Sequence, residues 1–146
     1  MDTRSLQDAA AAVVARVPYC WLVTQSGARP MGRILTGEDW AVQFVADLRS
    51  DKVAEIQQSS AVQLIFQDAA QDAFVALAGT ARLDKVVWKD AYEAYFPTER
   101  DRANATFVAV EVSLMRLWIR GVTPEPFGLH PTVLERDRAD LWHLSP

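Results

Sequence analysis

Cysteine and histidine are scarce in this sequence. One Cys and two His occur among the 146 residues, so Cys20 cannot form an internal disulfide. Cys20, His130 and His143 are the only soft or borderline metal ligands, and none stands at a ligand spacing from another. We therefore expect no metal site. Cys20 lies in the apolar run Tyr19–Val23, where we expect a buried and inert thiol.

Long apolar runs and an excess of positive charge are also absent. The longest apolar runs, such as Ala73–Gly79, are strand-sized and far short of the ~20 residues that cross a bilayer. The first residues lack the basic-then-apolar pattern of a secretory signal. With 15 Lys+Arg against 19 Asp+Glu, the chain lacks the basic balance typical of nucleic-acid binders. We therefore expect a cytoplasmic protein with no membrane and no nucleic-acid partner.

Common catalytic and nucleotide-binding motifs are missing as well. The sequence has neither the G-x-S-x-G elbow of serine hydrolases nor the G-x-G-x-x-G turn of dinucleotide-binding Rossmann domains. Gly32 and Gly37 have the spacing of a P-loop, but Glu38 and Asp39 follow where that loop needs Lys and Ser or Thr. We expect a β-turn at Gly37 instead.

What is present indicates one globular domain over residues 1–146. Half of the residues are hydrophobic, and six Gly with seven Pro are too few for a disordered chain. Apolar residues at helical spacing predict an N-terminal helix within residues 1–17, with Ser5 and Asp8 in capping-box positions and Pro18 at its end. A Pro-rich connection at 123–126 then leads into a C-terminal hairpin tail, residues 123–146, whose strands lie within Thr132–Leu144.

The middle of the chain alternates short β-branched and aromatic runs with turn residues, a pattern typical of an antiparallel barrel or sandwich. Six main strands are predicted at Tyr19–Gln25, Arg29–Thr36, Trp40–Ala46, Ala61–Gln67, Phe74–Leu83 and Thr106–Val112. Two helices are predicted between them, at Asp51–Ser59 with Ser50 as N-cap and at Asp84–Tyr95. The sequence therefore predicts a mainly β fold with flanking helices.

A candidate anion site lies where a strand ends and a helix begins. The free N–H groups at the start of the Asp51–Ser59 helix, the Ser50 hydroxyl and the cations Arg49 and Lys52 suit a bound phosphate. Arg29 and Arg33 could converge on the same place from the preceding strand. The alternative is that Ser50 is only an N-cap and that nearby carboxylates cancel the positive charge.

Aromatic residues in the tail offer a second signal. Trp118 and Trp142 lie outside the predicted strand meander, and burying two indoles there requires a partner subunit or a flat ligand.

Several motifs occur in the order found in one flavoprotein family. An Arg-Pro-Met step, a Ser-x-Lys-Val-x-Glu-Ile run, a Gly-x-Ala strand, a Phe-Pro step and a Trp-containing tail are found at Arg29–Met31, Ser50–Ile56, Gly79–Ala81, Phe96–Pro97 and Leu117–Gly121. From Tyr19 onward the chain thus resembles the FMN-binding split-barrel family of pyridoxamine 5′-phosphate oxidase and its short general-stress-protein relatives.

This resemblance implies an FMN-binding split β-barrel that forms a homodimer with the flavin sites at the interface. It implies an FMN-dependent oxidoreductase acting on a small-molecule substrate, with the ring between one subunit's strand backbone and Trp118 of the other. The residues expected to bind the flavin are Arg29, Met31, Arg33, Phe44, Val45, Ala46, Arg49, Ser50, Lys52 and Trp118, with His130 a candidate at the substrate face.

Three departures from the family pattern limit the activity that the resemblance implies. Ala46 stands where the family has a phosphate-side Thr, and Gly128 and Thr132 stand where the larger oxidase has arginines. These departures argue against true pyridoxamine-phosphate oxidase activity. The alternatives are a non-catalytic flavin- or ligand-binding protein that senses stress or redox state, and a structural dimer without cofactor. A deazaflavin or haem could also replace FMN on this fold.

Overall fold

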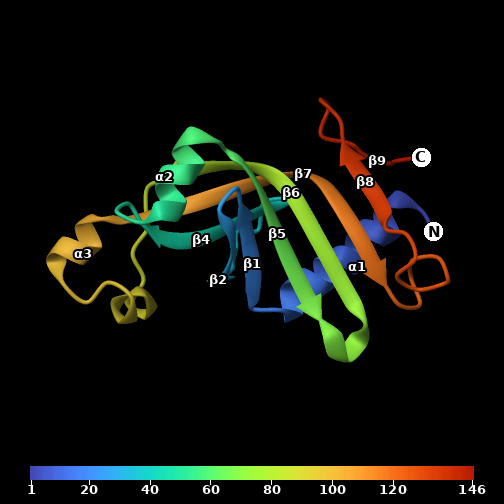
Figure 1. Cartoon of the computed structure of the whole chain (residues 1–146), viewed down its shortest axis with the longest axis horizontal. Coiled ribbons are helices and arrows are strands. Elements are labelled where there is room, and N and C mark those ends of the chain that lie inside the picture. The colour runs from blue at the N-terminus through green and yellow to red at the C-terminus, as the bar shows by residue number, and fades with distance from the viewer.

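The computed structural model describes all residues, 1–146, and contains one nine-stranded antiparallel sheet with helices around it (Figure 1). The strands are β1 Tyr19–Thr24, β2 Gly27–Gly32, β3 Ile34–Leu35, β4 Ala41–Asp47, β5 Ala61–Asp68, β6 Ala73–Asp84, β7 Ala105–Ile119, β8 Thr132–Arg136 and β9 Trp142–Leu144. The α-helices are α1 Thr3–Arg16, α2 Asp51–Gln58 and α3 Glu99–Ala103, and short 3₁₀ turns lie at η1 Ala69–Gln71 and η2 Asp90–Ala94.

One chain segment lies at both ends of the main sheet. The strand order is β2-β1-β5-β6-β7-β4-β3, and only Arg33 separates β2 from β3. Because consecutive strands occupy the two ends of this order, the sheet curls into a barrel that is split at Arg33. This confirms the predicted split β-barrel with six main strand segments.

Arg33 explains why the predicted strand Arg29–Thr36 is divided in two. Its guanidinium donates hydrogen bonds to the carbonyls of Val14 (Nε, 3.0 Å) and Ala15 (Nη2, 2.7 Å) at the end of α1. The last carbonyls of a helix have no intrahelical donor, and Pro18 prevents α1 from continuing. Arg33 therefore leaves the strand ladder and fastens α1 to the barrel.

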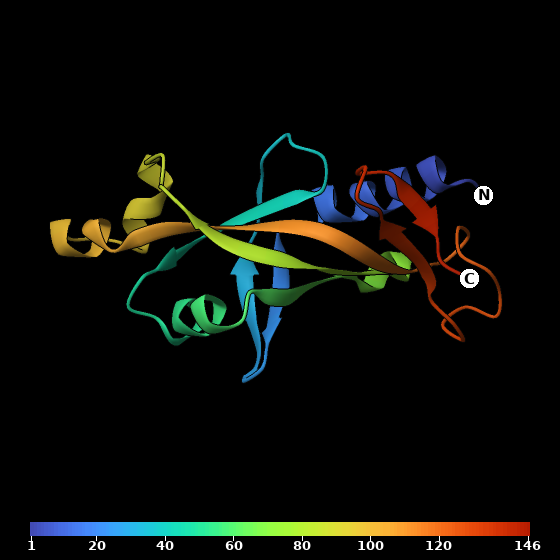
Figure 2. The same cartoon turned by 90° about the horizontal axis from the view of Figure 1, so that it is seen from above.

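Strands β6 and β7 form the long antiparallel pair at the centre of the molecule (Figure 2). Its pairing shifts between Ala78 and Gly79, where Ser113 of β7 has no partner. A Cβ atom on Gly79 would lie 2.1 Å from the carbonyl oxygen of Glu111, so only glycine fits this bulge. Strand β7 also continues to Ile119, beyond the predicted end at Val112, because paired apolar residues persist along β6. Trp118 is thus a strand residue and not part of the tail.

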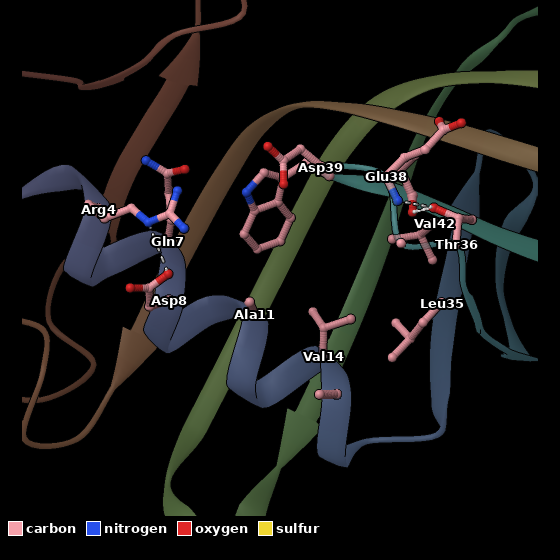
Figure 3. Close-up of a pocket in the computed structure, with 14 residues that line it drawn as sticks. Arg4, Gln7, Asp8, Ala11, Val14, Leu35, Thr36, Glu38, Asp39 and Val42 are labelled. Carbon is pink, nitrogen blue, oxygen red and sulfur yellow. Dashed lines mark hydrogen bonds and ion pairs between the residues drawn. The ribbon is translucent and has the colours of Figure 1, made fainter.

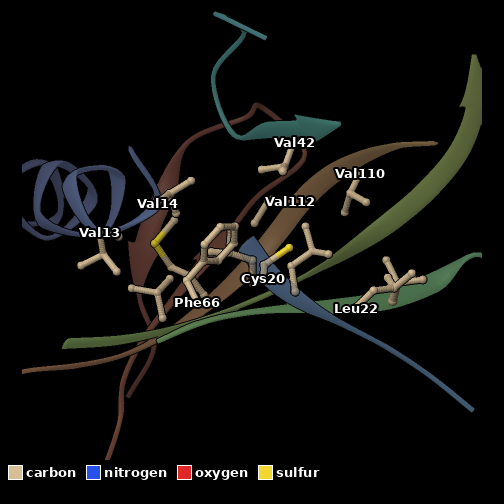
Figure 4. Close-up of a cluster of buried hydrophobic side chains, with 14 of the residues drawn as sticks. Val13, Val14, Cys20, Leu22, Val42, Phe66, Val110 and Val112 are labelled. Atoms are coloured by element: carbon tan, nitrogen blue, oxygen red, sulfur yellow. The ribbon is translucent and has the colours of Figure 1, made fainter. Parts of the chain in front are cut away.

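The core fills the barrel and the space under α1. Inward residues of adjacent strands form rows, such as Leu22, Leu64, Leu77 and Met115, that are fully buried. Figure 4 shows Val13 and Val14 of α1 beside Cys20 and Phe66 of this cluster. Cys20 is buried as predicted, and burial raises the pKa of its thiol to about 11.

Three sequence predictions are wrong in detail. The N-cap of α1 is Asp2, whose Oδ1 accepts from the N–H of Ser5 at 2.8 Å, and not Ser5 itself. The predicted helix Asp84–Tyr95 is an irregular segment that ends in η2. Its apolar side chains do not lie along one face of a helix but pack in an aromatic cluster of Trp88, Tyr92, Phe96 and Phe107. Trp142 needs neither partner nor ligand, because it is buried in the core edge-on to Trp40 at 6.0 Å.

None of the helices combines the length and the apolar composition that a membrane crossing requires.

Replacing Gly79 by alanine should destabilise the barrel strongly. The new methyl group would meet the rigid backbone of Glu111 and Val112, so we expect a loss of at least ~2 kcal/mol in the free energy of unfolding. Chemical denaturation measures this loss. Gly32→Ala is the matched control, because its Cβ would have only an ordinary contact with the Tyr19 side chain at 3.6 Å. Equal stabilities of the two variants would contradict the steric role of Gly79.

Candidate functional site

Lys52 lies where two hollows of the surface meet. The polar hollow, of about 550 Å³, is lined by Ser26, Arg29, Ser50, Asp51, Lys52, Ala54, Glu55 and Gln58. The apolar hollow, of about 610 Å³, is lined by Lys52 together with residues of β1, β2, β4 and the segment 91–96. Lys52 is the one residue that lines both.

Lys52 is half-buried and makes no ion pair in the free protein. Burial lowers the pKa of its ammonium group, the charge of Arg29 lowers it further, and Asp47 opposes the shift. The charge of Arg29 is matched by the carboxylate of Glu55 at 3.5 Å, whereas Lys52 has no carboxylate partner of its own. Such an arrangement suits an anion from outside the chain.

Arg29 is held through one guanidinium nitrogen and has no hydrogen-bond partner at another. Its Nη2 donates to Thr24 Oγ1 at 3.1 Å and Ser26 Oγ at 2.8 Å, and lies 3.5 Å from the carboxylate of Glu55. Its Nη1 is buried and has no hydrogen-bond partner. A buried donor without an acceptor is costly, so this atom indicates a place for an acceptor that the chain does not provide.

The start of α2 adds further free donors. The first N–H groups of a helix have no intrahelical acceptor. Ser50 occupies the N-cap position, but its Oγ donates to the carbonyl of Asp47 at 2.6 Å and makes no side-chain cap. The first-turn N–H groups of α2 are thus not satisfied by Ser50, and the positive end of the helix dipole lies beside Lys52.

Two of the predicted phosphate ligands are engaged elsewhere. Arg49 forms a bidentate ion pair with Asp47 (2.9 and 2.7 Å) and a further one with Asp101 (2.9 Å), which lowers the pKa of both carboxyls. Arg33 lines the apolar hollow, but its guanidinium is held by the end of α1. The structure therefore brings together Arg29, Ser50 and Lys52, and does not bring Arg33 and Arg49 to them as free cations.

The apolar hollow contains the other predicted residues of β2 and β4. Met31, Val45 and Ala46 line it, whereas the Phe44 side chain is fully buried in the core, so Phe44 can offer only backbone. The opposite wall is aromatic and was not predicted from the sequence. It consists of Tyr92, Tyr95 and Phe96, of which only Phe96 belonged to a recognised motif.

Trp118 and His130 lie far from this site within one chain. Ala46 pairs with Thr106 of β7, and Trp118 follows twelve residues later on that strand, which corresponds to about 40 Å of extended chain. His130 lines a separate hollow with Met1, Leu6 and Pro146, at the end of the molecule where both termini lie (Figure 1). Either residue could reach a flavin only from a partner subunit.

A further groove, of about 360 Å³, lies between α1 and the loop that precedes β4 (Figure 3). Asp8, Glu38 and Asp39 line it, and Asp8 is paired with Arg4 at 3.3 Å. None of the predicted site residues lies there.

Comparison with solved structures supports the fold. A protein related to general stress protein 26 from Clostridium acetobutylicum has a TM-score of 0.72 at 15% identity, with 92% of this chain and 96% of that chain covered. A pyridoxamine 5′-phosphate oxidase-related, FMN-binding protein from Nostoc punctiforme has a TM-score of 0.67 at 15% identity, with 98% and 95% covered. A general stress FMN/FAD-binding protein from Xanthomonas citri has a TM-score of 0.68 at 17% identity, with 84% and 94% covered.

No curated protein matches the sequence. The family model described as pyridoxamine 5′-phosphate oxidase like matches residues 7–123, most of the chain. This range contains both hollows and Lys52, and it confirms the family expected from the sequence motifs. The chain belongs to the pyridoxamine 5′-phosphate oxidase-like family.

Proposed function

We propose that the protein is an FMN-binding flavoprotein and that it acts as an FMN-dependent oxidoreductase. The observation that carries the proposal is Lys52, which has no ion-pair partner beside the free start of α2, together with the Nη1 of Arg29, which has no hydrogen-bond acceptor. A phosphate supplies the negative charge and the acceptor atoms that this place lacks. The FMN-binding and FMN/FAD-binding descriptions of two structural neighbours support the same ligand class.

The two hollows match the two halves of FMN. The polar hollow holds the cations and takes the phosphate, and the apolar hollow, with Met31, Val45 and the aromatic wall, takes the ring. Lys52 borders both, as expected of a residue beside the ribityl chain that joins phosphate to ring. The unpartnered Nη1 of Arg29, a donor with no acceptor in the chain, supports the fit of a phosphate here.

Bound flavin supplies hydride and electron transfer, and the protein supplies position and electrostatics. Arg29, Ser50 and Lys52 bind the phosphate, while the aromatic wall excludes water from the ring. Burial raises the pKa of the Tyr92 hydroxyl above its ordinary value. No histidine or cysteine lines either hollow. That observation favours the alternative function, a flavin carrier that senses redox state without turning over a substrate.

A second copy of the chain is proposed to complete each site. On the outer face of the sheet, side chains of β1, β5, β6 and β7 also line up across the strands. One such row consists of Trp21, Ile65, Ala76 and Arg116, and Phe74 and Trp118 lie in the next row. Trp21 is 41% exposed and Ile65, Phe74 and Trp118 are half-buried, and partly exposed large apolar side chains on one sheet face suit an association surface. A homodimer through this face covers the row and allows the partner's Trp118 to approach the ring.

Replacing Lys52 by methionine should weaken FMN binding and spare riboflavin binding. The variant loses one charge-assisted contact of about 1.5 to 3 kcal/mol, so we expect affinity for FMN to fall roughly 10- to 150-fold. Riboflavin lacks the phosphate, and its affinity should be the same in both proteins. Fluorescence titration with both flavins measures the difference. Lys85→Met, at an exposed position, serves as the matched control; equal FMN affinity in all three proteins would refute the assigned phosphate site.

Replacing Ile65 by lysine should split the dimer. A charge in the centre of the outward row cannot be buried without a partner, so light scattering should show a dimer for the natural chain and a monomer for Ile65→Lys. Gln57→Lys, on an exposed position of α2, should remain dimeric. A natural chain that is monomeric at micromolar concentration would overturn the proposed assembly.

A further inference from the structure

Glu55 connects the two sides of the polar hollow. It lies in the second turn of α2, three residues after Lys52, and its side chain is half-buried. Its carboxylate accepts a hydrogen bond from Thr24 Oγ1, at the end of β1, and lies 3.5 Å from Nη2 of Arg29 on β2. This carboxylate therefore links α2 to the β1–β2 hairpin that carries Arg29.

Glu55 also orients two hydroxyl groups of that hairpin. A hydroxyl has one proton to donate and two lone pairs that accept. Hydrogen bonds from Ser26 and Thr24 lower the pKa of Glu55, so the protons of both hydroxyls are directed at its carboxylate. Their oxygens are left as acceptors, and Nη2 of Arg29 donates to Ser26 at 2.8 Å and to Thr24 at 3.1 Å. Glu55 thus prepares two acceptors for one nitrogen of Arg29.

This network determines which nitrogen of Arg29 is left for a ligand. Nη2 is satisfied by the two hydroxyls and by Glu55, whereas Nη1 has no partner in the chain. Because a guanidinium is planar and its donors form a rigid fork, holding Nη2 also fixes the position of Nη1. A donor that is already in place loses less side-chain entropy when the ligand binds.

The contacts of Glu55 are made with Arg29 and not with Lys52. The charges that shift the pKa of Lys52 are those of Arg29 and Asp47. By charge alone, a carboxylate near a phosphate would weaken phosphate binding. Since the charge of Glu55 is balanced by Arg29 and by two O–H donors, the gain from a fixed guanidinium exceeds this repulsion. The two effects have opposite signs, so an experiment can separate them.

From these contacts we propose that Glu55 is a positioning residue of the phosphate site, which holds Arg29 through Thr24 and Ser26 so that Nη1 is in place for a phosphate oxygen. The proposal rests on the proposed function, because the phosphate is that of FMN. It gives a role to the acidic residue of the Ser50–Ile56 motif, which contacts no part of the flavin itself.

Replacing Glu55 by glutamine should weaken FMN binding, although the change removes a negative charge from the hollow. The neutral amide accepts the two hydroxyl protons less well, so Arg29 loses its support. We expect FMN affinity to fall at least fivefold in fluorescence titration, and riboflavin affinity to stay within twofold. Asp51→Asn is the matched control, because exposed Asp51 lines the same hollow outside the network. Its FMN affinity should equal or exceed that of the natural chain.

Two further variants test whether Glu55 acts through Arg29. In an Arg29→Met background, Glu55→Gln should change FMN affinity less than twofold, because no guanidinium remains to be held. Ser26→Ala, at an exposed turn position, removes one of the two acceptors and should lower FMN affinity at least twofold without altering the core.

NMR of the free protein provides a measurement without flavin. Rotation about the Nε–Cζ bond of Arg29 should be slow in the natural chain and faster in Glu55→Gln. Equal rotation rates, or an FMN affinity of Glu55→Gln that is within twofold of the natural value or higher, would overturn the present proposal and leave the proposed function intact. Failure of the natural chain to bind FMN would overturn both.

Discussion

Closure of the barrel by the single segment Gly27–Leu35 is the constraint on which the rest of the structure depends. This segment pairs with β1 through β2 and with β4 through β3, and Arg33 ties its midpoint to the end of α1. Since the two halves belong to one continuous strand path, Arg29 and Met31 are held beside the chain that runs from β4 into α2. The polar and apolar hollows are thus products of the same closure, and they share Lys52 because β4 and α2 are adjacent in sequence.

The cations predicted for the site fall into two groups. Arg33 donates hydrogen bonds to carbonyls of α1, and Arg49 forms ion pairs with carboxylates of the chain. These contacts stabilise the fold. Arg29 has an Nη1 without a hydrogen-bond partner, and Lys52 has an ammonium group whose pKa is lowered. Because that pKa is lowered, protonated Lys52 opposes folding, and this cost lessens as the pH rises through the lowered value toward the ordinary one. An anion bound beside Lys52 would raise this pKa and remove the cost.

The sequence predicted the parts of this fold that local patterns determine. Alternating strands, the α2 start at Ser50 and the family motifs all identify elements that the structure contains. The prediction of a helix at Asp84–Tyr95 was wrong because the apolar residues of this segment pack into an aromatic cluster around Phe107. The spacing of apolar residues within the segment does not reveal this contact with a distant strand. Arg33 was assigned to the site because charge is visible in a sequence, whereas the carbonyls of α1 that hold it are distant in the chain. Arg49 has one distant partner, Asp101, but its bidentate partner Asp47 is only two residues away, as the alternative of cancelling carboxylates had allowed. The aromatic wall of Tyr92 and Tyr95 was missed because the strands that it faces are likewise distant in the chain.

The central proposal is that Lys52, which has no ion-pair partner and lies beside Arg29 and the free start of α2, receives its counter-charge from a flavin phosphate. The most direct measurement is an NMR titration of the Lys52 side chain across alkaline pH, first in the free protein and then with saturating FMN. The account predicts a pKa below the ordinary lysine value of about 10.4 in the free protein and a marked rise when FMN is bound, with no such rise for riboflavin. An ordinary pKa that FMN leaves unchanged would contradict it.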